Sequence, residues 1–176
     1  MATTPEQIGP ALEIFFKLHA GRALEPEELA RTDRFADPIA RRFLIQTCSL
    51  FANRNITRVF TLRIDGVAVA SRVGFQLPDC LYLYHSGYDP EWRYYSVATT
   101  IVADAIKYAI SSGIRRVHLS MGVDGSKTRW NPETPLFHRA LCVRPQLSSR
   151  VALGLYSWAH TGPLNRVKSV LGRRFD

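Results

Sequence analysis

Three β-rich runs joined by two-residue turns constrain the fold of this chain more than any other feature. TRVFTLRI is separated from VAVASRVGFQL by Asp65-Gly66, a pair typical of a tight hairpin turn. A third run, CLYLYHSGY, follows after Pro78-Asp79. Because the turns are so short, the three runs are predicted to form an antiparallel meander.

Helical patterns flank this meander. Residues 5–23 carry apolar side chains at helical spacing. A second helix is predicted to begin at Asp37-Pro38, with the aspartate as cap and the proline in the first turn, and to end around residues 53–55. A third, long helix opens at Arg93 and stops near Gly113. The face that we expect the second helix to bury consists of Ile39, Phe43, Leu44, Thr47, Leu50 and Phe51.

Two further strands and a basic end complete the predicted order. IRRVHLSM, residues 114–121, reads as a strand, and residues 136–143 form another candidate. Helices around a meander predict an α/β (α+β) fold, with a mixed, mostly antiparallel sheet flanked by helices. We expect one domain over residues 1–145 and a basic, helical segment over residues 146–176.

Composition narrows the class of protein. Of the 176 residues, 46% are apolar and 11% aromatic, enough for a packed core. Cys48, Cys80 and Cys142 are odd in number and form no CxxC pair, so we expect neither a disulfide framework nor a metal site. We find no signal peptide and no apolar run near the ~20 residues of a membrane span, and expect a cytoplasmic protein. Hydrolase, metalloprotease and Walker-loop signatures are absent from the sequence.

The net charge of +8 is concentrated at the C-terminal end. From Arg144 onward there are six basic residues and one acid. Such an end can contact nucleic acid, an anionic membrane or a phosphorylated ligand, or can be simply solvated. Apolar stripes at helical spacing in residues 151–159 and 164–171 fit a membrane-surface helix, but packing on the domain or on a partner subunit is the interpretation we favour.

Small residues at the start of the long helix raise the question of an anion site. The first amides of a helix have no partner within the helix, so they can bind a phosphate, and an arginine at Arg93 can clamp it. The alternative is an ordinary serine N-cap beside two core tyrosines. The candidate ligand-binding residues are Arg93, Tyr94, Tyr95, Ser96, Val97 and Ala98.

These residues resemble the cofactor loop of the GNAT acyltransferase superfamily, Q/R-x-x-G-x-G/A. Here the loop reads Arg93-x-x-Ser96-x-Ala98, with serine in place of the first glycine. Over residues 11–145 the chain resembles most closely the GNAT domain of CelD-type cellulose-biosynthesis proteins, relatives of the Fem-type aminoacyltransferases. The matching motifs are Leu18-His19 with Arg22, Phe35-x-x-Pro38 with Phe43, Leu62 to Ala70, Tyr84 to Pro90, and Gly122, Lys127 and Trp130.

The chain departs from this family pattern at several positions. Ser96-Val97-Ala98 stands where the family has Ser-Pro-Gly, His118 where it has an aspartate, and Ser126 where it has a tyrosine. Family members commonly carry another GNAT-like half, so three forms stay open: a piece of a longer protein, a half that pairs with another such half or with a second copy as a homodimer, and a stand-alone form.

The resemblance implies transfer of an acyl group, typically acetyl, from acyl-CoA to an amine or hydroxyl that attacks the thioester directly. A backbone amide near His85 to Gly87 would polarise the thioester carbonyl, and Tyr94 and Tyr95 would flank the pantetheine arm. His118 is the candidate base, and Asp124 and Lys127 are the other catalytic candidates; a hydrogen-bonded histidine and an exposed loop lysine are the alternatives. The candidate substrate-binding residues are His19, Arg22 and His85.

Two other functions compete with this one. The first is a Fem-like transferase that takes an aminoacyl group from tRNA, which ranks lower because the basic excess lies in the tail. The second is a catalytically silent module that pairs with another subunit. The acceptor itself stays open: a small molecule or a cell-envelope intermediate, the latter suiting peripheral membrane contact by the tail.

Overall fold

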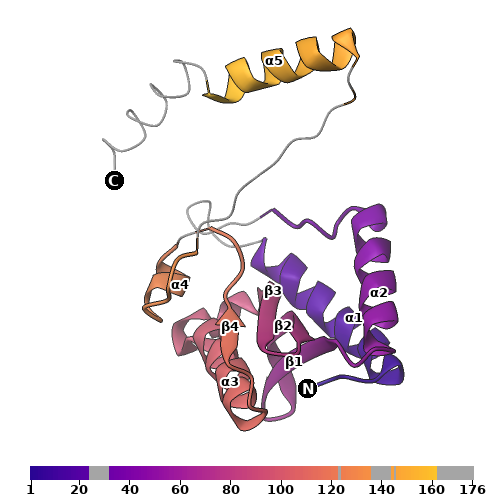
Figure 1. Ribbon diagram of the computed structural model, residues 1–176. Coiled ribbons are helices and arrows are strands. Elements are labelled where there is room, and N and C mark those ends of the chain that lie inside the picture. The colour runs from indigo at the N-terminus through magenta and orange to yellow at the C-terminus, as the bar shows by residue number, and fades with distance from the viewer. Residues whose placement is uncertain (24–31, 123, 136–143, 145, 162–176) are drawn as a thin grey trace. The chain divides into compact units, whose positions relative to one another are not determined.

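The computed structural model describes residues 1–23, 32–122, 124–135, 144 and 146–161. It divides into two compact units, Met1–Pro132 and Glu133–Asp176 (Figure 1). The second unit contains α5 (Leu147–Thr161), while the candidate strand at 136–143 lies outside the described residues. The elements of the first unit are α1 (Pro5–Arg22), α2 (Pro38–Ala52), β1 (Thr57–Ile64), β2 (Val67–Leu77), β3 (Cys80–Tyr88), the 3-10 helix η1 (Pro90–Tyr95), α3 (Val97–Ser111), β4 (Arg116–His118) and α4 (Gly125–Thr128).

The predicted meander is confirmed, with the strand bounds expected from the sequence. Asp65 and Gly66 both have positive φ, 48° and 80°, as a two-residue hairpin turn requires. The sheet has the order β1-β2-β3-β4, in which the first two pairings are antiparallel. β4 joins β3 in parallel after the chain crosses over through α3. This mixed, mostly antiparallel sheet with flanking helices is the predicted fold class.

Each face of the sheet has its own apolar core (Figure 1). On one face, α1 and α2 pack on side chains such as Val59 and Val73. On the other, α3 packs on side chains that include Val69 and Leu83. The sheet is therefore held between two layers of helices, and the positions of α1 and α3 relative to β3 are set by this packing.

The prediction of the buried face of α2 was wrong in part. Leu44 is buried as predicted, but Ile39, Phe43 and Leu50 are 79%, 68% and 66% exposed. The buried stripe continues from Leu44 to Cys48 and Ala52, spaced four residues apart. Both stripes have helical periodicity, and contact with α1 and β1 decides which of them is covered.

The start of the long helix also differs from the prediction. Residues from Pro90 to Tyr95 form a 3-10 turn, in which Asp89 Oδ1 accepts a hydrogen bond from Glu91 N at 3.1 Å. Ser96 then has φ 56°, and the left-handed residue separates this turn from α3. The predicted stop at Gly113 is confirmed by its φ of 69°.

Candidate functional site

β3 is paired on both sides over only part of its length. Its parallel pairing with β4 is limited to Cys80, Leu81 and Tyr82. Toward β2, Val73 pairs with His85 and Gly74 with Leu83, so a bulge occurs at Tyr84. Within the described part of the chain, residues 83–88 have no strand partner on the β4 side; we call them the open edge of β3. On that side the backbone groups are therefore not used by strand pairing.

The end of α1 is pinned to this open edge. A Cβ on Gly87 would lie 2.4 Å from His19 N, so the two backbones meet where only glycine fits. His19 Nδ1 donates to the carbonyl of Ser86 at 2.9 Å, and Arg22 Nη1 donates to Ser86 Oγ at 3.1 Å. The two motifs Leu18-His19 and Ser86-Gly87, far apart in sequence, therefore form one contact.

The contacts of the His19 ring are made by its two nitrogens. Because a carbonyl can only accept, Nδ1 carries a hydrogen. Nε2 is buried without a hydrogen-bond partner and lies 3.8 Å from Asp33 Oδ1. With both nitrogens buried in the protein, His19 acts by positioning α1 against β3 in this structure.

His85, at the bulge, faces the same cluster. Its ring lies edge-on to Phe35, with centroids 4.9 Å apart, and 6.2 Å from the ring of His19. Burial, with smaller contributions from the charges of His19 and Arg34, lowers the pKa of His85 to about 4. The imidazole is therefore neutral at pH 7. The structure brings together the three residues predicted to bind substrate.

His118 lies at the last paired position of β4, opposite Tyr82 of β3. Its ring stacks on Tyr82, with centroids 4.5 Å apart and 15° between the planes. Nδ1 accepts a hydrogen bond from Ser120 N at 3.1 Å. The neutral ring therefore carries its hydrogen on Nε2, which makes that nitrogen a donor. This tautomer fits a hydrogen-bond donor better than the predicted base.

Asp124 and Lys127 form an ion pair with each other and hydrogen bonds within their own loop. Asp124 caps α4 by accepting from Ser126 N at 3.0 Å. Burial favours the protonated form of Asp124, but the hydrogen bonds from Ser126 and the charge of Lys127 outweigh it and lower the pKa. Lys127 Nζ lies 3.3 Å from Asp124 Oδ2 and donates to the carbonyls of Met121 and Gly122. These contacts favour a structural role for both residues.

The start of α3 does not fit an ordinary cap beside core tyrosines. The Ser96 side chain makes no cap hydrogen bond, and Tyr94 and Tyr95 are 83% and 71% exposed. No hydrogen bond to a described residue uses the amides of Val97 or Ala98. Two amides at the positive end of a helix are thus available to an anion.

Two arginines lie near the start of α3, one in η1 and one after α4. Arg93 Nη2 donates to the hydroxyl of Tyr94 at 2.6 Å, and its guanidinium lies 4.6 Å from the centre of that ring. Arg129 Nη1 donates to Thr99 Oγ1 at 2.8 Å, within the first turn of α3. Sequence reasoning missed Arg129, because its position depends on how the chain after β4 folds back toward α3.

Comparisons with known proteins identify the family. A model described as an acetyltransferase (GNAT) domain matches residues 1–130. The chain belongs to this family. The predicted GNAT family and acyltransferase class are confirmed, and acyl-CoA as the co-substrate agrees with the match. No curated protein matches the sequence of this GNAT domain.

Solved structures show the same fold. An aminoglycoside acetyltransferase from an uncultured soil metagenomic sample, in complex with sisomicin, is 14% identical over 80% of this chain and 93% of its own, with a TM-score of 0.52. The complex of an acetyltransferase of the same description with trehalose has 12% identity over 80% and 93% of the two chains, and a TM-score of 0.50. At these identities the likeness to the GNAT domain is one of fold.

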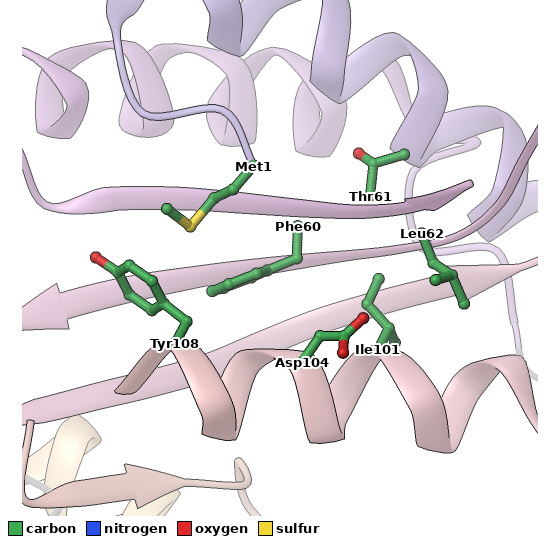
Figure 2. A pocket seen from close by; sticks show the side chains of 7 residues that line it. All are labelled: Met1, Phe60, Thr61, Leu62, Ile101, Asp104 and Tyr108. Atoms are coloured by element: carbon green, nitrogen blue, oxygen red, sulfur yellow. The ribbon is translucent and has the colours of Figure 1, made fainter. Parts of the chain in front are cut away.

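A separate hollow in the GNAT domain lies between β1 and α3, away from the residues discussed above (Figure 2). Its volume is about 250 Å³, and none of the predicted site residues lines it. The residues that line it are Met1, Phe60, Thr61, Leu62, Ile101, Asp104 and Tyr108. The candidate site of the GNAT domain is therefore better defined by the open edge of β3 and the start of α3.

Proposed function

We propose that this GNAT domain transfers an acyl group from acyl-CoA to an amine or hydroxyl of an acceptor, by direct attack on the thioester. The observation that carries the proposal is the start of α3, where the amides of Val97 and Ala98 have no described partner and lie close to Arg129. A cation is normally unfavourable at the positive end of a helix. An anion bound between Arg129 and the amides would remove that conflict.

The residues present fit the phosphates of CoA. Val97 and Ala98 would donate backbone hydrogen bonds, and Arg93 and Arg129 would supply charge from two sides. Ser96 fits at the family's glycine position because it adopts the left-handed conformation there. The exposed ring of Tyr95 can lie along the rest of the bound molecule. When bound, acyl-CoA supplies the activated thioester.

The open edge of β3 is the proposed place of reaction. A backbone amide at or just after the bulge, between Tyr84 and Gly87, would stabilise the negative charge that develops on the carbonyl oxygen. His118 would donate a hydrogen bond from Nε2. His85 would face the acceptor as a neutral ring that can accept a hydrogen bond from the attacking amine or hydroxyl. Asp124 and Lys127 would hold the loop beside His118 in place.

Titration calorimetry with acetyl-CoA tests the proposal. We expect micromolar binding, about −8 kcal/mol, by the full chain. Ala98→Asp should weaken binding at least about tenfold, because it places a carboxylate against the phosphates. The same substitution stabilises a helix start, so lost binding would not result from unfolding. Gln46→Asp, on the exposed side of α2, adds the same charge and should leave the affinity unchanged.

The competing functions predict other results. A Fem-like transferase would be stabilised against heat by aminoacyl-tRNA and not by acetyl-CoA, since a ligand of the native state raises Tm. A silent module would respond to neither. Equal affinity of the wild type and Ala98→Asp for CoA would contradict the placement of the phosphates at α3.

The membrane contact and the subunit pairing proposed for the chain remain separate questions. Within the described residues, none of the helices has the length and apolar character to span a bilayer. The second stripe of the tail, residues 164–171, lies outside the described residues. A cell-envelope acceptor and the CelD-type relationship are compatible with the family match and stay predictions.

A further inference from the structure

An unsatisfied arginine lies in the middle of the sheet. Arg72 belongs to β2, between Ser71 and Val73, both fully buried. Within the described part of the chain its guanidinium makes no hydrogen bond or ion pair, and its Nε is buried without a partner. Burial lowers the pKa of Arg72 to about 10, and the charge of Arg22 acts in the same direction. The group is still a cation at pH 7.

Arg58, another buried arginine of the same sheet, has its donors hydrogen-bonded to protein groups. Arg58 in β1 is 4% exposed and donates from Nε to the hydroxyl of Tyr108 at 2.8 Å. Its Nη1 donates to the carbonyls of Asn55 and Thr57. A buried guanidinium normally has its donors satisfied in this way. Among the described residues Arg72 has no such acceptor, so none of them provides a hydrogen-bonded counterpart for this cation.

A second guanidinium reaches the same place from α1. Arg22 donates to Ser86 Oγ, and its guanidinium lies 5.6 Å from the centre of the Tyr88 ring. Ser86 is the partner of Arg72 in the β2–β3 pairing. Ser86, on the open edge of β3, is therefore the hydrogen-bond partner of Arg22 and the strand neighbour of Arg72.

Asp124 is the carboxylate whose charge acts on Arg72, and it does not neutralise that arginine. Asp124 favours the charged form of Arg72, but its influence is smaller than the opposing one of Arg22. Asp124 is also engaged by Ser126 and Lys127. Asp124 therefore does not satisfy the guanidinium of Arg72, and a bidentate oxyanion is the ligand that an arginine fork binds best.

We propose that Arg72 and Arg22 bind an acidic group, a carboxylate or a phosphate, of the acceptor. This inference rests on the proposed acyl transfer, because it takes the open edge of β3 as the place where the acceptor meets the thioester. The phosphates of CoA are assigned to the start of α3, which leaves the arginine pair for another anion. A polycationic acceptor would be repelled here, which distinguishes this site from one built for an aminoglycoside.

The first experiment measures anion binding without turnover. The full chain is saturated with CoA, and its Tm is followed as inorganic phosphate is added at constant ionic strength. We expect Tm to rise for the wild type and for Arg42→Gln, an exposed arginine of α2, and not for Arg72→Gln. Arg22→Gln tests the pair independently, should Arg72→Gln fold poorly. A rise that persists in both variants overturns the proposal.

The second experiment measures selectivity with matched acceptors. Thiol release from acetyl-CoA is compared for an amino acid and its amide, and for an amino sugar and its phosphate. We expect kcat/KM at least about tenfold higher for the acidic member of a pair, and loss of that preference in Arg72→Gln with unchanged CoA affinity. Preference for succinyl-CoA over acetyl-CoA without acceptor preference would assign the pair to the acyl group and overturn the proposal.

Failure of the two proposals can be told apart. If CoA does not bind the wild type, the proposed acyl transfer fails, while the phosphate titration without CoA still reports on the arginine pair. If CoA binds normally and neither phosphate nor acidic acceptors distinguish the wild type from Arg72→Gln, only the anion site fails.

Discussion

Gly87 of β3 lies against the backbone of His19, at the point where α1 crosses the open edge of the strand. A Cβ at this glycine would come within 2.4 Å of His19 N and 2.7 Å of Leu18 C. Both contacts are to backbone, which cannot move aside as a flexible side chain can. The position of α1 on the sheet, and with it the hydrogen bonds to Ser86, depends on the missing side chain.

Gly87→Ala should therefore destabilise the fold strongly. We expect a loss of about 3 kcal/mol in the free energy of unfolding, measured with urea, because α1 must shift away from β3. Gly9→Ala is the matched control: it lies in α1 with open space around its Cβ, and should stabilise the helix by about 0.5–1 kcal/mol. Equal effects of the two substitutions would contradict the close backbone contact.

Glycine substitutions should distinguish the two small residues at the start of α3. Ser96 has φ 56°, so Ser96→Gly removes left-handed strain and should raise stability by up to about 1 kcal/mol. Ala98 lies within α3, and Ala98→Gly should lower stability by about 0.5–1 kcal/mol. Thermal unfolding of both variants gives the comparison. Opposite signs from those expected would show that the left-handed residue is not Ser96.

The buried histidine at the bulge should make stability depend on pH. The pKa of His85 is about 4 in the folded protein and near 6.5 when unfolded. Above pH ~6.5 the ring is neutral in both states, and its contribution is fully present. As pH falls toward 4, only the unfolded chain gains the proton, so stability decreases. Urea unfolding between pH 4 and 7 should show a flatter profile for His85→Gln than for the wild type.

Loss of the Nε2 donor of His118 should affect turnover and not binding. His118→Phe keeps a ring that can stack on Tyr82 but removes the hydrogen of Nε2. We expect kcat with acetyl-CoA to fall by ~10²-fold, at unchanged CoA affinity by calorimetry. Lys107→Met, on the exposed side of α3, serves as the control. A loss well below tenfold would leave His118 with a packing role.

Local chemistry explains which elements could be predicted. Asp65-Gly66 can adopt two successive positive φ values, so two neighbouring residues are enough to predict the hairpin turn. Asp37 caps α2 through Ile39 N at 2.9 Å, an interaction over two positions. The face of α2 was mispredicted because two apolar stripes fit the same period, and the choice between Phe43 and Cys48 is made by distant partners.

The candidate site also combines features that the sequence determined with features that only the tertiary structure decided. The residue types in the chain determined the meander and a set of polar side chains that includes His19, Arg22 and His85. Only the tertiary structure decided that Arg72 would lie beside Arg22, that Arg129 would reach α3, and which nitrogen of His118 carries the hydrogen. The physical reason is range: turns and caps depend on neighbours along the chain, whereas burial, charge pairing and tautomers depend on groups that meet only after the sheet and helices have packed.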